Sequence, residues 1–437
     1  MAIDFKDLEK QIEERGRIQT LDNGITLITE NVPGSGLVQG NIEISAGAGH
    51  ETDEDHGIMH FLEHVIFGPS ILYPNRDDRS LQSSLLGLRL NANTGHYQIN
   101  YPIQGANSSQ YILQENFLES FRIISEMTFS PNINEESLQR EMSVVQRERI
   151  EHEQKNAAKP FYDVTKTIGT KVYGNNPLFR KEILGTEESI SRITVPKLRE
   201  YHSNFFVGNN LLVQIAGDLN SGIVLEDAIK DELNKVPKGN KAKNLDIMPE
   251  KSFNGRERLD LVSPVKGNAI VEIYFQLPPS HNFDAIPMDL LSYILGSSNG
   301  LLFQDIREER GLVYSIGSQI EGHRKTGLLK IGYGVEPKHL DESLQAVDDN
   351  IQKLKEGKFD ARLVDAYVAA TLPGALYSFQ NPGWIYNELN QRHGVEKLGF
   401  ESSALQRLQT SLNLNKKDVV NAANQYLGED RLTVIVK

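Results

Sequence analysis

Two histidines and a glutamate stand close together in the segment DEDHGIMHFLEHVIFGPS, at His60, Glu63 and His64. On an α-helix, residues three and four apart share one face, so these three side chains would point the same way. The rest of the circumference is almost entirely apolar, which predicts a helix packed inside a domain. Two imidazoles and a carboxylate buried without partners would cost several kcal/mol. A bound divalent cation would compensate them.

Zinc is the ion that suits this pattern. Two histidines at i and i+4 reach one tetrahedral Zn²⁺, which leaves room for a third protein ligand and a water molecule. His60 and His64 are therefore predicted ligands, and Glu63 is the predicted general base beside that water. The spacing H-x-x-E-H is also the inverted form of the zinc-peptidase helix motif. A hydrogen-bonded structural pair of histidines is the alternative, and manganese or cobalt could occupy the same ligands.

The third ligand should come from the acidic helix predicted at residues 134–156. Spacing alone does not choose among its carboxylates. Glu141 and Glu148 are seven residues apart, so they lie on one helical face with two valines between them. The other acidic residues of this helix suit a solvated face.

Length and composition set the class of protein. The 437 residues are too many for one ordinary core and predict two or more domains. The net charge of −13 argues against a nucleic-acid partner and would attract basic or unstructured peptides. Because the chain has no cysteine, a metal must be held by histidine and carboxylate. The acidic N-terminus and the lack of a long apolar run predict a cytoplasmic protein without a membrane span.

The chain reads as two halves with the same order of elements. The first half begins with strands in 17–50, continues with a helix from about Asp55 and closes with a strand at 210–219. A polar stretch rich in lysine, glycine and asparagine, residues 236–258, is the predicted linker.

The second half repeats the pattern with a strand at 269–277, a helix at 286–296 and a closing strand at 431–437. Its sequence MDLLSY aligns with MHFLEH of the first half but lacks the metal ligands. We therefore predict an α+β fold of two homologous domains, 1–240 and 241–437, each an antiparallel-rich sheet covered by helices. Chance similarity between two apolar helices is the alternative.

The motifs HFLEH, NANTGHYQINY and REMSVVQRE together resemble the M16 family of inverted-motif zinc metallopeptidases, which includes pitrilysin, insulin-degrading enzyme and the mitochondrial processing peptidase. In that family the second glutamate of an E-x6-E pair is the zinc ligand and the first supports the ligand shell. The resemblance thus implies Glu148 as the ligand and Glu141 as its support. The segment FGPSILYPNRDDRS departs from the family's usual F-K-G-T, which indicates an insertion after the helix motif.

Substrate contacts follow from the same resemblance. It implies that residues 91–101 include an edge strand to which a peptide adds by backbone pairing, with Asn91 and Ala92 near the scissile bond. It also implies that Arg307 and Tyr314, the family's R-x6-Y pair, contact the substrate backbone or the developing oxyanion. Taken alone, these residues would be read as an ordinary strand, a solvated arginine and a half-buried tyrosine.

A chain of this length resembles one bowl of the family's two-bowl clamshell. This implies a homodimer in which Arg307 and Tyr314 of one subunit serve the zinc of the other. The prediction is a cytoplasmic metalloendopeptidase with one Zn²⁺ per chain, which cuts unfolded peptides or flexible segments, basic ones by preference, in a closed chamber. The alternatives are a non-catalytic core subunit and the zinc-bearing subunit of a heterodimeric processing peptidase. The natural substrate and the choice between processing and degradation lie beyond the sequence.

Overall fold

The fold is described for residues 3–107, 109–157, 159, 161–173, 182–220, 224–243, 245, 253–323, 325–381 and 383–437 of a computed structural model. The chain forms two compact units. The first unit consists of Met1–Lys155, Arg180–Leu245 and Phe379–Asn390, and the second of Asn156–Phe179, Asp246–Ser378 and Gln391–Lys437. The predicted linker, 236–258, lies partly outside the described residues. The assignment of residues 1–240 to a zinc-binding domain and of residues 241–437 to a substrate-contacting domain stays a prediction.

The first unit is built on one mostly antiparallel sheet. Among the described residues it has eight strands in the order β1-β2-β8-β3-β6-β4, with β5 beside β6 and β7 beside β3. β2 and β8 run parallel. The strands are β1 (Gly16–Thr20), β2 (Thr26–Asn31), β3 (Leu37–Ile44), β4 (Leu88–Arg89), β5 (Asn93–Thr94), β6 (Ile99–Gly105), β7 (Ile112–Leu113) and β8 (Leu211–Gly217).

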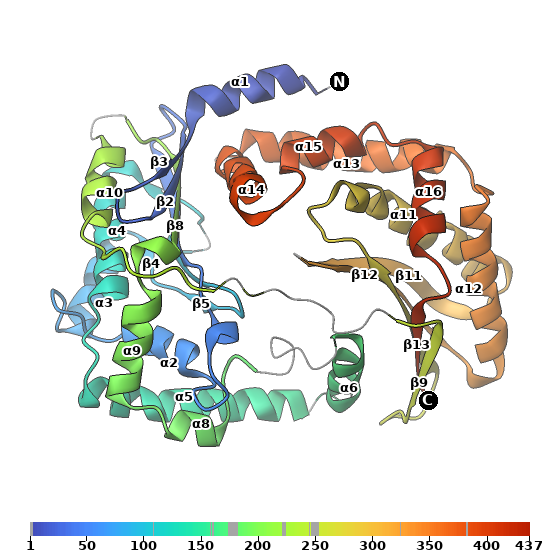
Figure 1. Ribbon diagram of the computed structural model, residues 1–437, viewed down its shortest axis with the longest axis horizontal. Helices are drawn as coiled ribbons and strands as arrows, with labels where there is room; N and C mark the ends of the chain where they lie inside the picture. The colour runs from blue at the N-terminus through green and yellow to red at the C-terminus, as the bar shows by residue number, and fades with distance from the viewer. Residues whose placement is uncertain are drawn as a thin grey trace. The chain divides into compact units, whose positions relative to one another are not determined.

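Helices pack on one face of this sheet (Figure 1). Alternate strand residues such as Ile42 and Ile44 point to that face and form a core with α2, α4, α9 and α10. The helices of the unit are α1 (Phe5–Arg15), α2 (Ile58–Ile66), α3 (Arg76–Leu85), α4 (Gln114–Phe129), α5 (Glu135–Ala157), α8 (Glu187–Ser191), α9 (Val195–Phe205) and α10 (Leu225–Leu233), with short turns η1 (Ala48–His50) and η2 (Gly208–Asn210).

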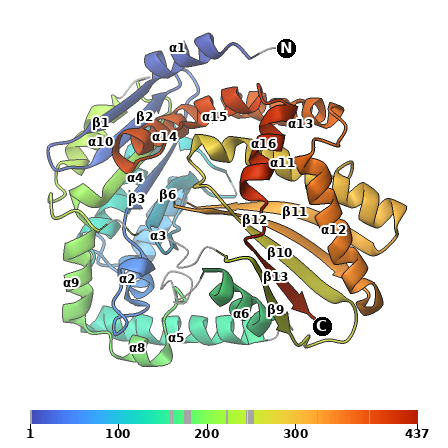
Figure 2. The ribbon, with the colours of Figure 1, turned by 45° about the vertical axis from the view of Figure 1, so that its right-hand side comes forward.

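The second unit has its own sheet and core. Its described part holds five strands in the order β11-β12-β10-β13-β9, of which β13 and β9 run parallel. Helices α11, α12 and α16 share a core with one face, and α6 packs on the other face (Figures 1 and 2). The strands are β9 (Arg256–Leu261), β10 (Ala269–Leu277), β11 (Val313–Gly322), β12 (Gly327–Val335) and β13 (Arg431–Val436).

The remaining elements of the second unit are mostly helical. Helix α14 continues from the first unit into the second. The helices are α6 (Tyr162–Tyr173), α11 (Ile286–Gly296), α12 (Leu340–Lys355), α13 (Arg362–Gln380), α14 (Trp384–Leu398), α15 (Ala404–Ser411) and α16 (Lys416–Tyr426), with short segments η3 (Phe283–Ala285), η4 (Phe303–Glu309) and η5 (Pro337–His339). Within the described part of the chain, no helix combines the length and apolar character needed to cross a bilayer.

The two sheets share one topology. In each, the closing strand lies between two early strands: β8 between β2 and β3, and β13 between β9 and β10. The closing strand is parallel to the first of these neighbours and antiparallel to the second. In each unit, the next helix after that second neighbour is a buried one, α2 or α11. The predicted α+β fold of two like domains is confirmed.

Local differences from the predicted elements have physical reasons. The helix expected from about Asp55 begins at Ile58, because Gly57 takes a left-handed conformation (φ 93°) that interrupts the helix. The strand expected over 91–101 is divided into β5 and β6, because the amide of Gly95 bonds to the carbonyl of Gln98 and turns the chain.

The carboxylate of Glu43 lies on the sheet face turned away from the first unit's core. It stands on β3 between Asn100 of β6 and Leu212 of β8. Burial raises the pKa of Glu43 to about 7. Its neutral form is therefore favoured in the folded protein.

We expect Glu43→Gln to stabilise the protein at high pH. The pKa of Glu43 is higher in the folded state than in the unfolded state. Its contribution to the free energy of unfolding therefore falls as pH rises from about 4.5 to 7 and stays lower above that window. The variant should gain about 2 kcal/mol at pH 8, a few degrees in melting temperature, and much less at pH 5. Calorimetry at both pH values measures this, with Glu13→Gln as an exposed control. A gain that is equal at both pH values would contradict the account.

Candidate metal centre

Helix α2 places its polar side chains inside the first unit. Ile58, Met59, Phe61, Leu62, Val65 and Ile66 are all fully buried in the core. His60 is buried with them, at 7% exposure, whereas Glu63 and His64 are half-buried. The helix packs against α9 and β5. The apolar residues thus hold this helix inside, and the two imidazoles go with it.

Three side chains converge on one point. The Nε2 atom of His64 lies 3.0 Å from Glu148 Oε2, and the Nε2 atom of His60 lies 3.8 Å from Glu148 Oε1. All three offer a ligand atom within 4.8 Å of one another. Ligand atoms of a tetrahedral zinc ion lie about 3.3 Å apart, so these distances straddle the spacing that Zn²⁺ requires.

The two histidines of α2 contact each other directly. The rings of His60 and His64 meet edge to face, with centroids 4.7 Å apart. The buried Nδ1 atom of His60 has no hydrogen-bond partner among the described residues. A metal ion on the Nε2 side of both rings fits this donor set, because neutral imidazoles and one carboxylate are zinc ligands.

Opposing effects set the charges of the three groups. Burial lowers the pKa of His60 to about 4, and the neighbouring His64 adds to this effect. Burial also lowers the pKa of His64, but the carboxylates of Glu141 and Glu148 outweigh it and raise that pKa to about 9. The hydrogen bond with His64 holds the pKa of Glu148 below its usual value. A cation thus fits between these groups, in competition with the proton on His64.

Glu141 supports the predicted ligands from behind. Its Oε2 atom lies 3.8 Å from Nδ1 of His64, on the opposite side of the ring from Glu148. The Nε atom of Arg140 donates to the other oxygen of Glu141 at 2.8 Å. These contacts favour one orientation of the His64 ring, and the supporting role of Glu141 in a metal site stays a prediction.

Glu63 is held by a residue that the sequence reading missed. The hydroxyl of Thr94, on β5, donates a hydrogen bond to Glu63 Oε2. Burial raises the pKa of Glu63, although the bond from Thr94 opposes this. A carboxylate with a raised pKa beside a metal site is suited to accept and return a proton. The only signal for Thr94 was its place in the alternating segment.

The N-terminal end of α2 is bound by a buried carboxylate that sequence reasoning also missed. Glu51 Oε2 accepts from the amide of Gly57 at 2.9 Å, and Oε1 accepts from the amide of Met59 at 2.8 Å. These are amides that a helix start leaves without intrahelical partners, and a negative charge there favours the helix dipole. Three other acids lie closer in sequence, so spacing could not single out Glu51.

The C-terminal end of α2 is bound by an arginine from the next helix, α3. Arg79, on α3, is 1% exposed and donates to the carbonyl oxygens of Phe67 and Gly68. Burial lowers the pKa of Arg79 to about 10, and the charges of Arg76 and Arg140 add to this. A cation on the last carbonyls of a helix stabilises its end. Arg79 thus supplies a structural contact to the end of the helix that carries His60 and His64.

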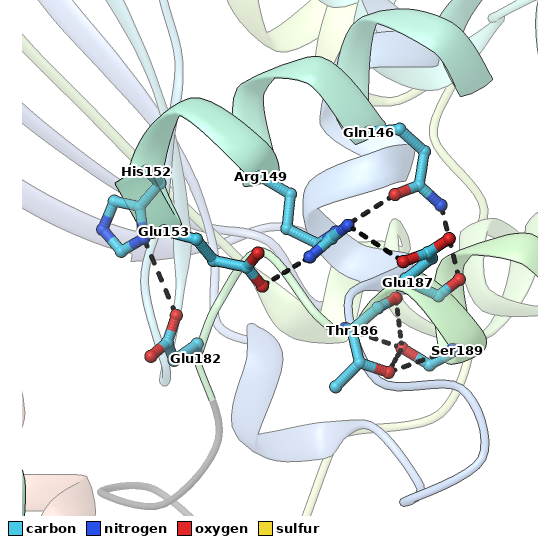
Figure 3. A network of polar contacts seen from close by, with 8 residues as sticks. All are labelled: Gln146, Arg149, His152, Glu153, Glu182, Thr186, Glu187 and Ser189. Carbon is cyan, nitrogen blue, oxygen red and sulfur yellow. Dashed lines mark hydrogen bonds and ion pairs between the residues drawn. The ribbon is translucent and has the colours of Figure 1, made fainter. Parts of the chain in front are cut away.

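Helix α5, which carries Glu148, is tied to the segment that follows the undescribed residues 174–181. Arg149, 6% exposed, contacts Glu153 and Glu187 and donates to Gln146 at 3.0 Å (Figure 3). In the same network, the amide of Gln146 donates to the carbonyl of Glu187, and His152 pairs with Glu182. The predicted zinc ligand therefore sits beside a buried, well-anchored arginine.

The same segment also touches the start of α2. The hydroxyl of Ser189 donates to the carbonyl of His56 at 2.6 Å. Gly185, with φ 72°, lies directly against Gly57. A Cβ atom at Gly185 would lie 2.5 Å from the His56 carbonyl oxygen and 2.9 Å from the Gly57 Cα atom. One short segment thus contacts both helices that carry the predicted ligands.

Arg307 and Tyr314 form a separate group in the second unit. The guanidinium carbon of Arg307, on η4, lies 4.5 Å from the ring centre of Phe303 and 5.5 Å from that of Tyr314. Tyr314, at the start of β11, is 84% exposed rather than half-buried. Buried Asp305 anchors η4 by accepting from Arg310 at 2.7 Å and from Asn350 at 2.6 Å. The structure thus places Arg307 and Tyr314 together as a cation–π pair.

Asn91 and Ala92 lie between β4 and β5, immediately before the short strand that carries Thr94. Asn91 is exposed, and Ala92 is half-buried against the core. β4 is the last strand in the order of the sheet. They thus precede Thr94, whose hydroxyl bonds to Glu63, by two or three residues. Their role in substrate binding stays a prediction.

Comparison with known proteins identifies the family of the chain. A family model described as "Insulinase (Peptidase family M16)" matches residues 26–185, and one described as "Peptidase M16 inactive domain" matches residues 192–371. The "Uncharacterized zinc protease YmxG" of Bacillus subtilis is 26% identical over 95% of this chain and 97% of its own length. An "Uncharacterized zinc protease" of Rickettsia felis is 23% identical over 97% of this chain and 98% of its own.

Solved structures show the same fold. A protease from Helicobacter pylori superposes with a TM-score of 0.74 over 97% of this chain and 99% of its own, at 19% identity. The first half of the periplasmic protease PqqL from Escherichia coli superposes with a TM-score of 0.75 over 97% of this chain and 92% of that half, at 16% identity. The chain belongs to the M16 peptidase family, whose named relatives here are zinc proteases.

We expect Gly185→Ala to weaken metal binding. The added methyl group must push against the backbone of His56 and Gly57, which displaces the start of α2. Zinc affinity should fall about tenfold, as it does when the groups that support a ligand are disturbed. Competition with a fluorescent chelator measures the affinity.

Gly34→Ala is the matched control, because Gly34 also has a positive φ (77°) but a Cβ atom there meets nothing within 4 Å. Both variants carry the cost of a non-glycine residue at positive φ, and only Gly185→Ala carries the clash. Equal losses of zinc affinity in the two variants would show that the contact does not matter.

Proposed function

We propose that this protein is a zinc-dependent endopeptidase that hydrolyses unfolded peptides or flexible segments. The observation that supports this most strongly is the convergence of His60, His64 and Glu148, with Glu63 one turn away on the same buried helix. The M16 family membership and the zinc-protease names of the relatives support the same class of reaction.

In this proposal His60, His64 and Glu148 hold one Zn²⁺, with Glu141 behind His64. When bound, the ion supplies Lewis acidity: it lowers the pKa of water and polarises a carbonyl group. Glu63 takes a proton from the water molecule as the water oxygen attacks the carbonyl carbon of the peptide bond. It returns that proton to the peptide nitrogen as the C–N bond breaks. The bond from Thr94 keeps the Glu63 carboxylate turned toward the site.

Arg307 and Tyr314 are proposed to donate to the substrate carbonyl or the oxyanion that develops on it. The guanidinium group of Arg307 contacts the rings of Phe303 and Tyr314, and these contacts hold it in place before substrate arrives. Such preorganised donors stabilise developing charge without reorganisation cost.

Peptide binding is proposed to use backbone pairing at the sheet edge near Asn91 and Ala92. A peptide must be extended to pair in this way, so folded proteins would be poor substrates. The net charge of −13 would favour basic peptides.

A homodimer is the proposed working form. The chain corresponds to 48% of the full PqqL chain, yet it matches 92% of that protein's first half. A second copy would supply the missing half, with Arg307 and Tyr314 of each subunit serving the zinc of the other. Cytoplasmic location is proposed as well.

Glu63→Gln should abolish peptide cleavage while zinc remains bound, because the amide cannot accept the proton from water but leaves the ligands intact. A loss of at least about a thousandfold in turnover is expected for removal of the base. Cleavage of a mixed library of unfolded peptides, read by mass spectrometry, measures the activity, and elemental analysis measures zinc. Glu54→Gln, in an exposed position of the preceding loop, is the control. If the wild type cuts nothing, the non-catalytic or heterodimeric alternative replaces the proposal.

The homodimer can be tested by complementation. Glu63→Gln and Arg307→Ala should each be inactive alone, because each lacks one part of the shared site. Mixing them after dissociation should restore up to about a quarter of wild-type activity, since half the dimers are mixed and each contains one complete site. If mixing restores nothing although mixed dimers form, each chain completes its own site.

A further inference from the structure

A cavity of about 250 Å³ lies in the second unit, between helix α6 and the sheet face opposite that unit's main core. One wall is apolar and comes from α6 and the residue before it. The other is the sheet, which contributes charged and phenolic groups. The apolar wall contains Phe161, Val164, Ile168 and Val172, and the sheet contributes Glu272, Tyr274, Glu321 and Lys330.

The charged groups that line the cavity among the described residues sum to an excess of one negative charge. Glu272, on β10, accepts from the hydroxyl of Tyr274 at 2.7 Å and lies 3.7 Å from the ammonium group of Lys330. Glu321, on β11, accepts from the hydroxyl of Tyr173 at the end of α6. Two carboxylates face one ammonium group, so a single added cation would balance the cavity.

The pKa values of the two phenols of the cavity are both raised. Burial raises the pKa of Tyr274, and the charge of Glu272 raises it further. Burial and Glu321 act on the pKa of Tyr173 in the same direction. Both hydroxyls therefore remain donors to the carboxylates.

Two glycines leave the cavity and its surroundings open. Gly169, on α6, lines the cavity, and a Cβ atom there would meet nothing within 4 Å. Gly332, on β12 directly opposite Glu272, is likewise free of neighbours at its Cβ position. Pockets for drug-sized molecules measure about 300–1,000 Å³, so this volume suits one side chain or one chain end.

We propose that this cavity binds a cationic amine or guanidinium group on an aliphatic stem, supplied by a lysine or arginine side chain or by the amino terminus of a peptide. The apolar wall of α6 contacts the stem, and Glu272 and Glu321 accept from the cationic head. The inference rests on the proposed function for the kind of ligand, an extended peptide. It gives that function a specific preference for basic peptides.

The test measures binding rather than cleavage. Short unstructured peptides labelled at the C-terminus are titrated with the full-length Glu63→Gln protein, and fluorescence anisotropy gives the dissociation constants. The first peptide is N-acetylated and has a single central lysine. The second is also N-acetylated and has glutamine at that position. The third has the sequence of the glutamine peptide but a free amino terminus. The lysine peptide should bind about tenfold more tightly than the acetylated glutamine peptide, the size expected for a charge-assisted contact.

Two variants of the cavity should remove this difference. Glu272→Gln with Glu321→Gln removes the negative charge, and Gly169→Leu fills the space from a helix position where leucine is favoured over glycine. Gly374→Leu is the matched control, because Gly374 is also helical, is open at its Cβ position and lies on α13 outside the cavity.

The outcomes separate the two proposals. The inference is overturned if Gly169→Leu keeps the tenfold difference in affinity between the lysine and glutamine peptides. It is also overturned if the protein with an unaltered cavity binds these two peptides equally well. A tighter complex of the third peptide identifies the amino terminus as a source of the cation. Failure of the wild type to cleave any peptide overturns the proposed function, whereas the comparison of lysine with glutamine peptides can still be read.

Discussion

The structure of the first unit depends on the burial of a polar triad on an apolar helix. Helix α2 is held in the core by its isoleucines, leucine and phenylalanine, and this buries His60 and half-buries Glu63 and His64. Such groups are tolerated only if each finds a partner. Glu148 comes from α5, Thr94 from β5 and Glu141 from two turns earlier on α5. The demand for compensation therefore dictates which segments must meet.

Contacts at both ends of α2 fix the position of this helix. Glu51 accepts from the first amides, and Arg79 donates to the last carbonyls. Gly185 permits a backbone contact beside Gly57 that no larger residue could make. These contacts span more than a hundred residues of sequence, and together they leave α2 little freedom to slide or rotate. A fixed helix keeps the two imidazoles at one spacing, which a metal site requires.

The second unit shows what the same design becomes without a metal. Helix α11 occupies the place of α2 in an equivalent topology, and the aligned positions hold Asp289, Ser292 and Tyr293. Ser292 pairs with Ser318 at 2.8 Å, and the ring of Tyr293 meets that of Tyr367. Ser292 and Tyr293 therefore contact other residues of the second unit. The two units thus share the central strand order but differ in the side chains at these aligned positions.

The sequence by itself determined the helix α2, its three chemical groups and the duplicated order of elements, because periodicity and short spacing are local properties of a chain. It narrowed the third ligand to a helix face, and resemblance to a family selected Glu148 from it. Only the tertiary structure decided which distant residues stand behind the site, such as Thr94, Glu51 and Arg79. Their types are common and their partners lie far away in sequence, so no local pattern marks them. The cavity beneath α6 is likewise a product of packing, since its walls come from a helix and strands more than ninety residues apart.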